Sequence, residues 1–451
     1  MSTTSTPATP EQQPHGVHVI GIGRTGAAYV EALLRTGEIE DILAKPGTSL
    51  AAVLIDVGED DMFVPNDYAR SLGKRLASRE IPVGRFSYES VLLKMPNGSA
   101  LAKDLESARA PFKAATGQEL TLKLPKDVAT PQPGAHIPRA LAKALGAVCT
   151  HVGDKPIGTA LQHFVEQVKK STNPATVLVV FGLAGGTGSG MAVDIARTLK
   201  AQLPPTVQVA GLGQLSHSGD GEYYNSLAQT MALEDIDTAM RGDAAANPFP
   251  AGFVVVSTEH SWQRLTAYTS TGVKEVRQRF KQMVTNRFVA DSFMRWALEH
   301  DGEHLARTLS RSGGKWMLFD VAKLTHPGVQ VLPGEAGSKW DSVLQQWIGF
   351  TPQFAGLSDG FKTDYVEIHV HAPRDMRIDM IDAEMRKVVG SRYLNGNGSS
   401  VATFQTEFFD ALTAYANVIL WGTSKEDLTA YGEAKAGVGK SSAAAKALES
   451  A

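Results

Sequence analysis

The most regular pattern in the chain is a short, fully apolar run followed by glycines and then by residues with helical spacing. Residues 17–20 form the first such run, residues 50–55 another and residues 176–181 the clearest one. Apolar runs of this length, bounded by turns, predict strands that are buried on both faces. Strands that alternate with amphipathic helices predict β-α-β units. The first part of the chain is therefore predicted to be α/β, with a parallel, Rossmann-like sheet.

Helical spacing follows most of these runs. Ala27, Val30, Leu33 and Leu34 fall on one face of a helix after the first strand. The same spacing predicts helices at residues 157–170, 191–199, 225–240 and, as one long central helix, about 261–300. Further strands are predicted at residues 207–210 and 252–256.

The pattern divides the chain into five parts. Beyond Gly313-Gly314, strands predicted at 315–323, 365–372 and 418–421 and helices predicted at 378–389 and 405–415 indicate a smaller α+β domain. The Ala/Lys/Gly/Ser-rich end predicts a loose tail. The predicted parts are a disordered arm at 1–15, a first domain at 16–260 with an elaborated segment at about 60–145, the central helix at 261–300, the second domain at 301–425 and a flexible tail at 426–451.

Composition narrows the classes of function. Among the 451 residues, 44 are Lys or Arg and 47 are Asp or Glu, a net charge of −3 that argues against direct binding of nucleic acid. The basic residues of the central helix, Arg287 among them, alternate with acids and predict a solvated face. Cys149 is the only cysteine, which excludes a disulfide framework and a thiolate metal site within one chain. No membrane span and no secretory signal are found in the sequence, so a cytoplasmic location is expected.

Two glycine loops carry the candidate chemistry. Gly21-Ile22-Gly23-Arg24-Thr25-Gly26 follows the first strand and opens a helix, where backbone N–H groups and the helix dipole favour an anion. This pattern is typical of a dinucleotide site, with Asp56 as the acid that binds the ribose. A tight turn without a ligand is the alternative explanation.

The second loop, at residues 185–190, follows the clearest strand. Gly185, Gly186, Gly188 and Gly190 leave the main-chain N–H groups open, and Thr187 and Ser189 add hydroxyl groups. Two such loops at the ends of neighbouring strands favour a ligand with a polyphosphate chain, since a dehydrogenase needs only one of them.

At these residues the sequence resembles the tubulin/FtsZ superfamily of GTPases. Ala184 and the loop 185–190 match the family's GGGTG(S/T)G signature in all but its first glycine. The resemblance implies a site for GTP or GDP, with Mg²⁺ held mainly by phosphates and water. Gly153 and Gly158 stand in a segment similar to the family's γ-phosphate-sensing loop.

The resemblance extends to the ribose and the base. Residues 218–225 are similar to the family's ribose loop and to the helix start whose asparagine contacts guanine, which assigns Asp220, Glu222 and Asn225 to the nucleotide. Glu259 stands where the family has Asn at the start of the central helix. The TubZ and CetZ branches resemble the chain more than FtsZ does, because the tail shows no FtsZ-like partner peptide.

The loop after the central helix supplies the catalytic prediction. In the family this loop carries acids that enter the nucleotide site of the next subunit and position the hydrolytic water. Asp301 falls on the first acid, whereas the second falls on His304, with Glu303 one residue earlier. The resemblance implies a GTPase that polymerises head-to-tail, with itself and an adaptor protein as partners. Two alternatives stay open: a nucleotide-binding filament or scaffold protein with little hydrolysis, and an NAD(P)-linked Rossmann enzyme.

Overall fold

The structure of the protein is a computed structural model. It describes residues 14–125, 128–131, 136–217, 219–220, 227–242, 244–258, 261–262, 274–298, 300–314, 316–323, 329–333 and 365–371. The predicted helices at 378–389 and 405–415 and the predicted strand at 418–421 lie outside these residues.

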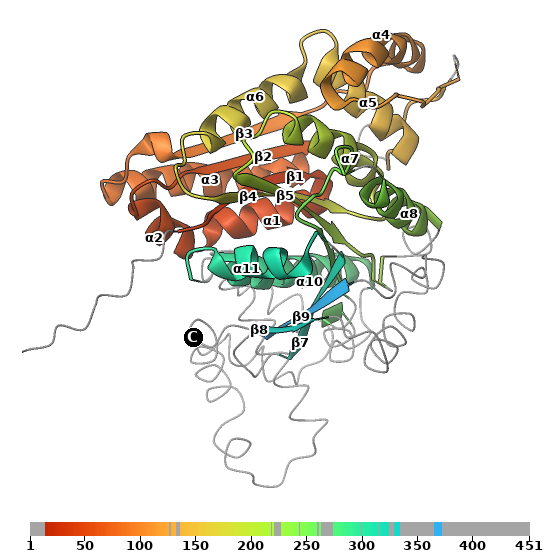
Figure 1. Ribbon diagram of the computed structural model, residues 1–451. Helices are drawn as coiled ribbons and strands as arrows, with labels where there is room; N and C mark the ends of the chain where they lie inside the picture. The colour runs from red at the N-terminus through yellow and green to blue at the C-terminus, as the bar shows by residue number, and fades with distance from the viewer. Residues whose placement is uncertain are drawn as a thin grey trace, which may run out of the picture.

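One twisted sheet organises the described residues (Figure 1). Its strands follow the order β3-β2-β1-β4-β5-β6-β7-β9-β8, and every pair is parallel except the last, β9 with β8. The predicted α/β class with a parallel, Rossmann-like sheet is confirmed. The strands are β1 (Gly16–Ile22), β2 (Leu50–Asp56), β3 (Phe86–Leu92), β4 (Ala175–Gly182), β5 (Val207–Gln214), β6 (Phe253–Val256), β7 (Trp316–Lys323), β8 (Val329–Pro333) and β9 (Tyr365–His371).

Helices cover both faces of the sheet (Figure 1). One apolar core joins the sheet to α1 (Gly23–Arg35), α2 (Glu38–Ala44), α3 (Asp60–Ser78), α10 (Lys274–Leu298) and α11 (Glu303–Ser312). The opposite core joins it to α4 (Gly98–Thr116), α5 (Arg139–His151), α6 (Pro156–Val168), α7 (Gly186–Lys200) and α8 (Leu227–Arg241).

The central strands are buried on both sides, which is why they are continuous apolar runs. In β1, Val17 and Val19 face the core of α1 and α10, whereas Ile20 and Ile22 face the core of α5 and α7. Successive side chains of a strand point to opposite faces, so one strand contributes to both cores.

The structure adds elements inside the segment 60–145, which the sequence analysis left as an elaborated connection. Helix α3 contains Pro65 and α4 contains Pro111, and both prolines obscure the helical pattern. The central helix is described from Lys274 onward. Strand β7 pairs with β6 and so continues the same sheet; the domain boundary at residue 300 stays a prediction.

Buried histidines predict a loss of stability in acid. Burial lowers the pKa of His18 in β1 to about 3 and that of neighbouring His15 to about 4, so both are neutral in the folded chain. The unfolded chain protonates them near pH 6.5, so the free energy of unfolding should fall below that pH, by on the order of 2 kcal/mol per histidine at pH 5. Asp56, whose pKa is raised to about 6, offsets part of this loss.

Urea unfolding at pH 7.5 and pH 5 tests this. A His18→Leu variant should show a flatter dependence on pH than the wild type. Equal unfolding free energies for the wild type at the two pH values would contradict the prediction.

Candidate nucleotide-binding site

The two glycine loops lie at the topological switch point of the sheet. Strands β1 and β4 are neighbours at its centre, and from there the chain continues outward in opposite directions, through β2 and β3 or through β5 and β6. In open α/β sheets, ligands bind in the crevice at the carboxyl ends of the two strands at this point. Here those ends carry the loops 21–26 and 185–190.

The two loops also contact each other. A Cβ placed on Gly23, whose φ is +72°, would lie 3.6 Å from the Thr187 Cβ and 3.7 Å from the Gly188 nitrogen. A Cβ on Gly188 would lie 2.7 Å from the Phe181 Cβ and 3.1 Å from the Ile22 carbonyl oxygen. The glycines therefore allow two backbone turns to approach closely, and Gly23 leaves open the space in front of the Gly188 N–H group.

Both helix starts at this point suit an anion. Helix α1 begins at Gly23 and α7 at Gly186, and neither has a side-chain cap on its backbone N–H groups or an acid in its first turn. Uncapped N–H groups and the positive end of the helix dipole favour phosphate. Two such starts, packed against each other, fit a polyphosphate chain better than a single phosphate.

The hydroxyl groups of the second loop differ in orientation. Ser189 donates a hydrogen bond to the Gly185 carbonyl oxygen over 2.6 Å and is buried, so its hydroxyl serves the first turn of α7. Thr187 lies beside Gly23 of the first loop. Of the two, Thr187 is therefore the hydroxyl that lies where the two loops meet.

The carboxyl end of β2 adds charge beside the first loop. Arg24, at the start of α1, pairs with Asp61 over 3.0 Å, and its side chain is mostly exposed. Burial raises the pKa of Asp56 to about 6, and the charge of Asp61 adds to the rise. The Thr25 hydroxyl lies against Gly182 at the end of β4. Asp56 thus lies close to Arg24 of the first loop.

A third wall of the site was missed by the sequence analysis. A Cβ on Gly186 would overlap the Ile137 carbonyl oxygen, and one on Gly190 would lie 2.5 Å from the Arg139 carbonyl oxygen. Arg139 also donates to the Ser189 carbonyl oxygen over 3.2 Å and pairs with Asp235 of α8 over 2.5 Å. Gly186 and Gly190 are therefore required by the segment that begins α5. No residue type marks such a contact in the sequence, because backbone carbonyls make it.

The other predicted nucleotide residues are less closely placed. Gly153 lies in the turn between α5 and α6, and Gly158 lies in the first turn of α6, where it packs against the Thr150 carbonyl oxygen. Asp220 accepts a hydrogen bond from the His217 backbone N–H over 2.9 Å. Glu222, Asn225 and Glu259 lie outside the described residues.

The segment with Asp220 forms an ordered turn beyond β5. The His217 ring stacks on Trp262, with centroids 4.3 Å apart and planes 12° from parallel. A Cβ on Gly219 would overlap the same indole. Burial lowers the pKa of His217 to about 4, so the ring is neutral at pH 7. This turn is held in place by aromatic packing.

The candidate catalytic residues lie at the other end of the strands, beside the amino end of β1. The His15 backbone N–H, just before β1, donates to the Asp301 carbonyl oxygen over 2.8 Å, and a Cβ on Gly302 would overlap the His15 carbonyl. Asp301 pairs with Lys45 and Glu303 with Arg307. The backbone of His304 lies in the first turn of α11. The structure therefore separates these residues from the glycine loops by the whole length of β1.

Within the described residues, no three His, Cys, Asp or Glu side chains are grouped so as to hold a metal ion. Nor is any helix in this part of the chain long and apolar enough to cross a membrane.

One sequence family matches part of the chain. Residues 135–293, which run from the third wall through the signature loop into α10, match the family described as "Tubulin like". This part of the chain, which includes the second glycine loop, is therefore similar to the tubulin/FtsZ superfamily. No curated protein matches the chain as a relative.

Several solved structures match the chain at low identity and low structural similarity. CetZ1 from Haloferax volcanii, a GDP-bound monomer, is 19% identical over 67% of this chain and 66% of its own, with a TM-score of 0.35. A GTPγS-form protofilament of TubZ from Bacillus thuringiensis serovar israelensis is 15% identical over 77% and 70%, with a TM-score of 0.35. FtsZ from M. jannaschii is 11% identical over 79% and 86%, with a TM-score of 0.33. The chain thus spans just under two thirds of the length of CetZ1.

Proposed function

We propose that the protein binds GTP with Mg²⁺, polymerises head-to-tail and hydrolyses GTP at the contact between subunits. One observation supports this above all: the nucleotide loops and the candidate catalytic loop lie at opposite ends of the same strand. Loop 21–26 follows the carboxyl end of β1, and the Asp301 carbonyl binds the residue just before its amino end. Seven residues at about 3.3 Å each separate the two sites by about 20 Å.

That distance prevents the acids of one chain from acting on its own nucleotide. A carboxylate acts on a water only at hydrogen-bond range, about 3 Å. The site is therefore complete only when the surface at the amino ends of the strands of one subunit meets the surface at the carboxyl ends of the strands of the next. A contact between two different surfaces, repeated without closure, produces a filament.

The residues around the glycine loops have different roles in the proposed binding of nucleotide. The N–H groups that open α1 and α7 hold the phosphates, and the Ile137–Arg139 segment fixes the start of α7 from the other side. Mg²⁺ keeps most of its water and binds phosphate oxygens, which agrees with the small number of acids nearby. Bound Mg²⁺ supplies neutralisation of phosphate charge.

The two candidate catalytic acids are partly exposed. The Asp301 side chain is 31% exposed and that of Glu303 26% exposed, so both can be presented to a neighbouring subunit. As carboxylates they accept a proton from the attacking water. Ion pairs with Lys45 and Arg307 hold them in place in a single subunit.

Those ion pairs also favour a second candidate function. If Lys45 and Arg307 keep both acids engaged in the filament, the protein binds nucleotide and assembles but turns GTP over slowly. In either case a cytoplasmic location and an adaptor protein as partner belong to the proposal.

Competition binding tests the choice of nucleotide. We expect GTP to displace a fluorescent guanine nucleotide at least tenfold more effectively than ATP, in the presence of Mg²⁺, because the ribose and base segments resemble those of guanine-specific relatives. Sedimentation with GTP, with GDP and without nucleotide then measures assembly. Equal affinity for ATP would refute the guanine assignment, and tight binding of NAD alone would favour the Rossmann-enzyme alternative.

A further inference from the structure

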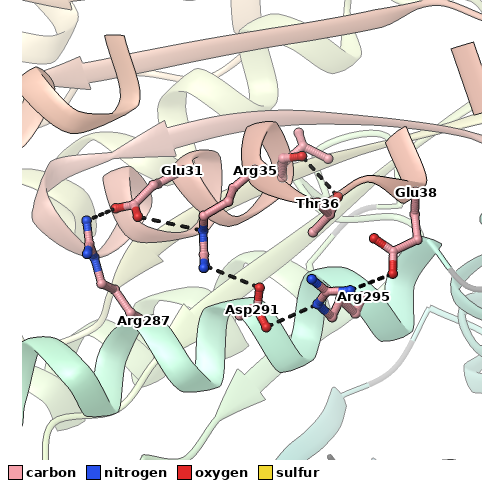
Figure 2. A network of polar contacts seen from close by, with 8 residues as sticks. Glu31, Arg35, Thr36, Glu38, Arg287, Asp291 and Arg295 are labelled. Carbon is pink, nitrogen blue, oxygen red and sulfur yellow. Dashed lines mark hydrogen bonds and ion pairs between the residues drawn. The ribbon is translucent and has the colours of Figure 1, made fainter. Parts of the chain in front are cut away.

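Six charged side chains connect α1 and α2 with α10 in a buried interface (Figure 2). Arg287 binds Glu31 over 2.7 Å, and Arg35 binds Asp291 over 3.2 Å. The other three contacts are Arg35 with Glu31 over 3.8 Å, Arg295 with Asp291 over 3.2 Å and Arg295 with Glu38 over 2.7 Å. We call these six residues, Glu31, Arg35, Glu38, Arg287, Asp291 and Arg295, the charge ladder.

The interface corrects the sequence analysis, which placed Arg287 on a solvated helix face. Its side chain is 6% exposed, and that of Asp291 is 4% exposed. Burial lowers the pKa of Arg287, and burial likewise raises that of Glu31, although Arg287 and Arg35 oppose the second shift. Burying paired charges is often no better for stability than burying apolar side chains of similar size. The ladder therefore calls for another explanation than stability.

The order of the charges provides one. Along α1 into α2 the signs are minus, plus, minus, at Glu31, Arg35 and Glu38. Along α10 the signs are plus, minus, plus, at Arg287, Asp291 and Arg295. The residue numbers of the paired side chains increase in the same direction on both sides, so the two segments run parallel. Opposite charges face each other at all three levels.

A slide of one helical turn would reverse this match. Moving α10 by about 5.4 Å in one direction would place Asp291 against Glu31 and Arg295 against Arg35. Moving it equally far the other way would place Arg287 against Arg35 and Asp291 against Glu38. Each displacement faces like charges in a buried interface, whereas the apolar contacts of α10, such as Phe293 on Tyr29, are less selective for register.

We propose that the charge ladder fixes the axial register of α10 on α1, and with it the separation between the nucleotide loops and the loop at residues 300–302. Helix α1 begins within the first glycine loop, and α10 ends just before the loop at residues 300–302. The six residues of the charge ladder are positioning residues. On the proposed function, which this last step rests on, the same register sets the spacing of composite sites along a filament.

Distances between spin labels test the register directly. Labels on Asp41→Cys in α2 and Arg307→Cys in α11, both exposed positions, are introduced into a Cys149→Ser chain. The wild-type ladder should give one narrow distance without nucleotide. Inverting α10 alone (R287E, D291R, R295E) should shift that distance by about 5 Å or split it, because only the slipped registers now pair opposite charges.

Inverting all six charges, by adding E31R, R35E and E38R, should restore the single wild-type distance. Inverting the exposed pair Asp67 and Arg70 within α3 is the matched control and should change nothing. An apolar variant that removes all six charges (E31L, R35M, E38L, R287M, D291L, R295M) decides independently of whether the α10-inverted chain folds, and its distance distribution should be broader than the wild type's.

A narrow, wild-type distance in the apolar variant would overturn the proposal, because apolar packing would then fix the register. A single unshifted distance in a folded α10-inverted chain would overturn it as well. Neither result depends on GTP, so the register can fail while GTP hydrolysis stands, or hold while hydrolysis is absent.

Discussion

Gly23→Ala should abolish tight nucleotide binding while leaving the chain folded. Its Cβ would lie 3.6 Å from the Thr187 Cβ and 3.7 Å from the Gly188 nitrogen, in the space that the proposed site assigns to a phosphate oxygen. Loss of two charge-assisted hydrogen bonds, at about 1.5–3 kcal/mol each, weakens affinity by at least about 100-fold. Fluorescence titration with labelled GTP measures the loss.

The chain offers a matched control for backbone strain. Gly117, which ends α4, has a φ of +70° against +72° for Gly23, and nothing lies within 4 Å of its Cβ direction. Gly117→Ala should lose the same conformational free energy, about 1–2 kcal/mol, and bind GTP like the wild type. If Gly23→Ala binds GTP as well as Gly117→Ala does, the two loops are only structural turns.

Asp301→Asn combined with Glu303→Gln should slow hydrolysis by about 10²–10⁴-fold while nucleotide affinity stays unchanged. These substitutions keep the shape of the side chains and remove the proton acceptors. Because the loop lies about 20 Å from its own nucleotide loops, the defect should be repaired in trans. Phosphate release is the measurement, at protein concentrations that support assembly.

Mixing gives the decisive result. Gly23→Ala chains lack nucleotide but keep Asp301 and Glu303. The Asp301→Asn/Glu303→Gln variant binds nucleotide but lacks these two acids. Each alone should be inactive, whereas an equal mixture should recover roughly a quarter of the wild-type rate, if subunits join at random in a head-to-tail contact. Asp41→Asn, an exposed and ion-paired acid of α2, is the control and should hydrolyse normally. No recovery in the mixture would contradict a composite site.

The sequence predicted the sheet best where the strands are buried on both faces. Strands β1, β2 and β4 appear as continuous apolar runs because helices cover both of their sides. Strand β3 lies at the edge of the sheet and is only partly buried, so its mixed sequence at residues 86–92 gives no such signal. Pro65 hid α3 for a similar reason, because local patterns cannot show that tertiary packing tolerates a proline. Pro111 obscured the last turns of α4, of which the sequence indicates only a weak helical stretch at residues 101–110.

The candidate site was predicted through its glycines, since these report the close approach of two backbones. The third wall was not predicted. The space beside Gly186 and Gly190 is occupied by backbone carbonyl groups of a segment about 50 residues earlier, and every residue has a carbonyl group, so the sequence gives no signal for this contact. The charge ladder was missed because alternating charges on α10 look the same whether they meet water or a complementary helix. Only the position of α1 distinguishes the two.

The backbone bond between His15 and Asp301 has a practical consequence for anyone who works with the protein. Any sequence fused ahead of β1 must leave the fold at the edge that carries the candidate catalytic loop. On the proposed function, an affinity tag or fluorescent protein placed close to His15 would occupy the surface that a neighbouring subunit needs, and would block growth at that end. A tag chosen to be removable by protease would avoid this, and an uncleaved one would serve as a selective terminator of assembly.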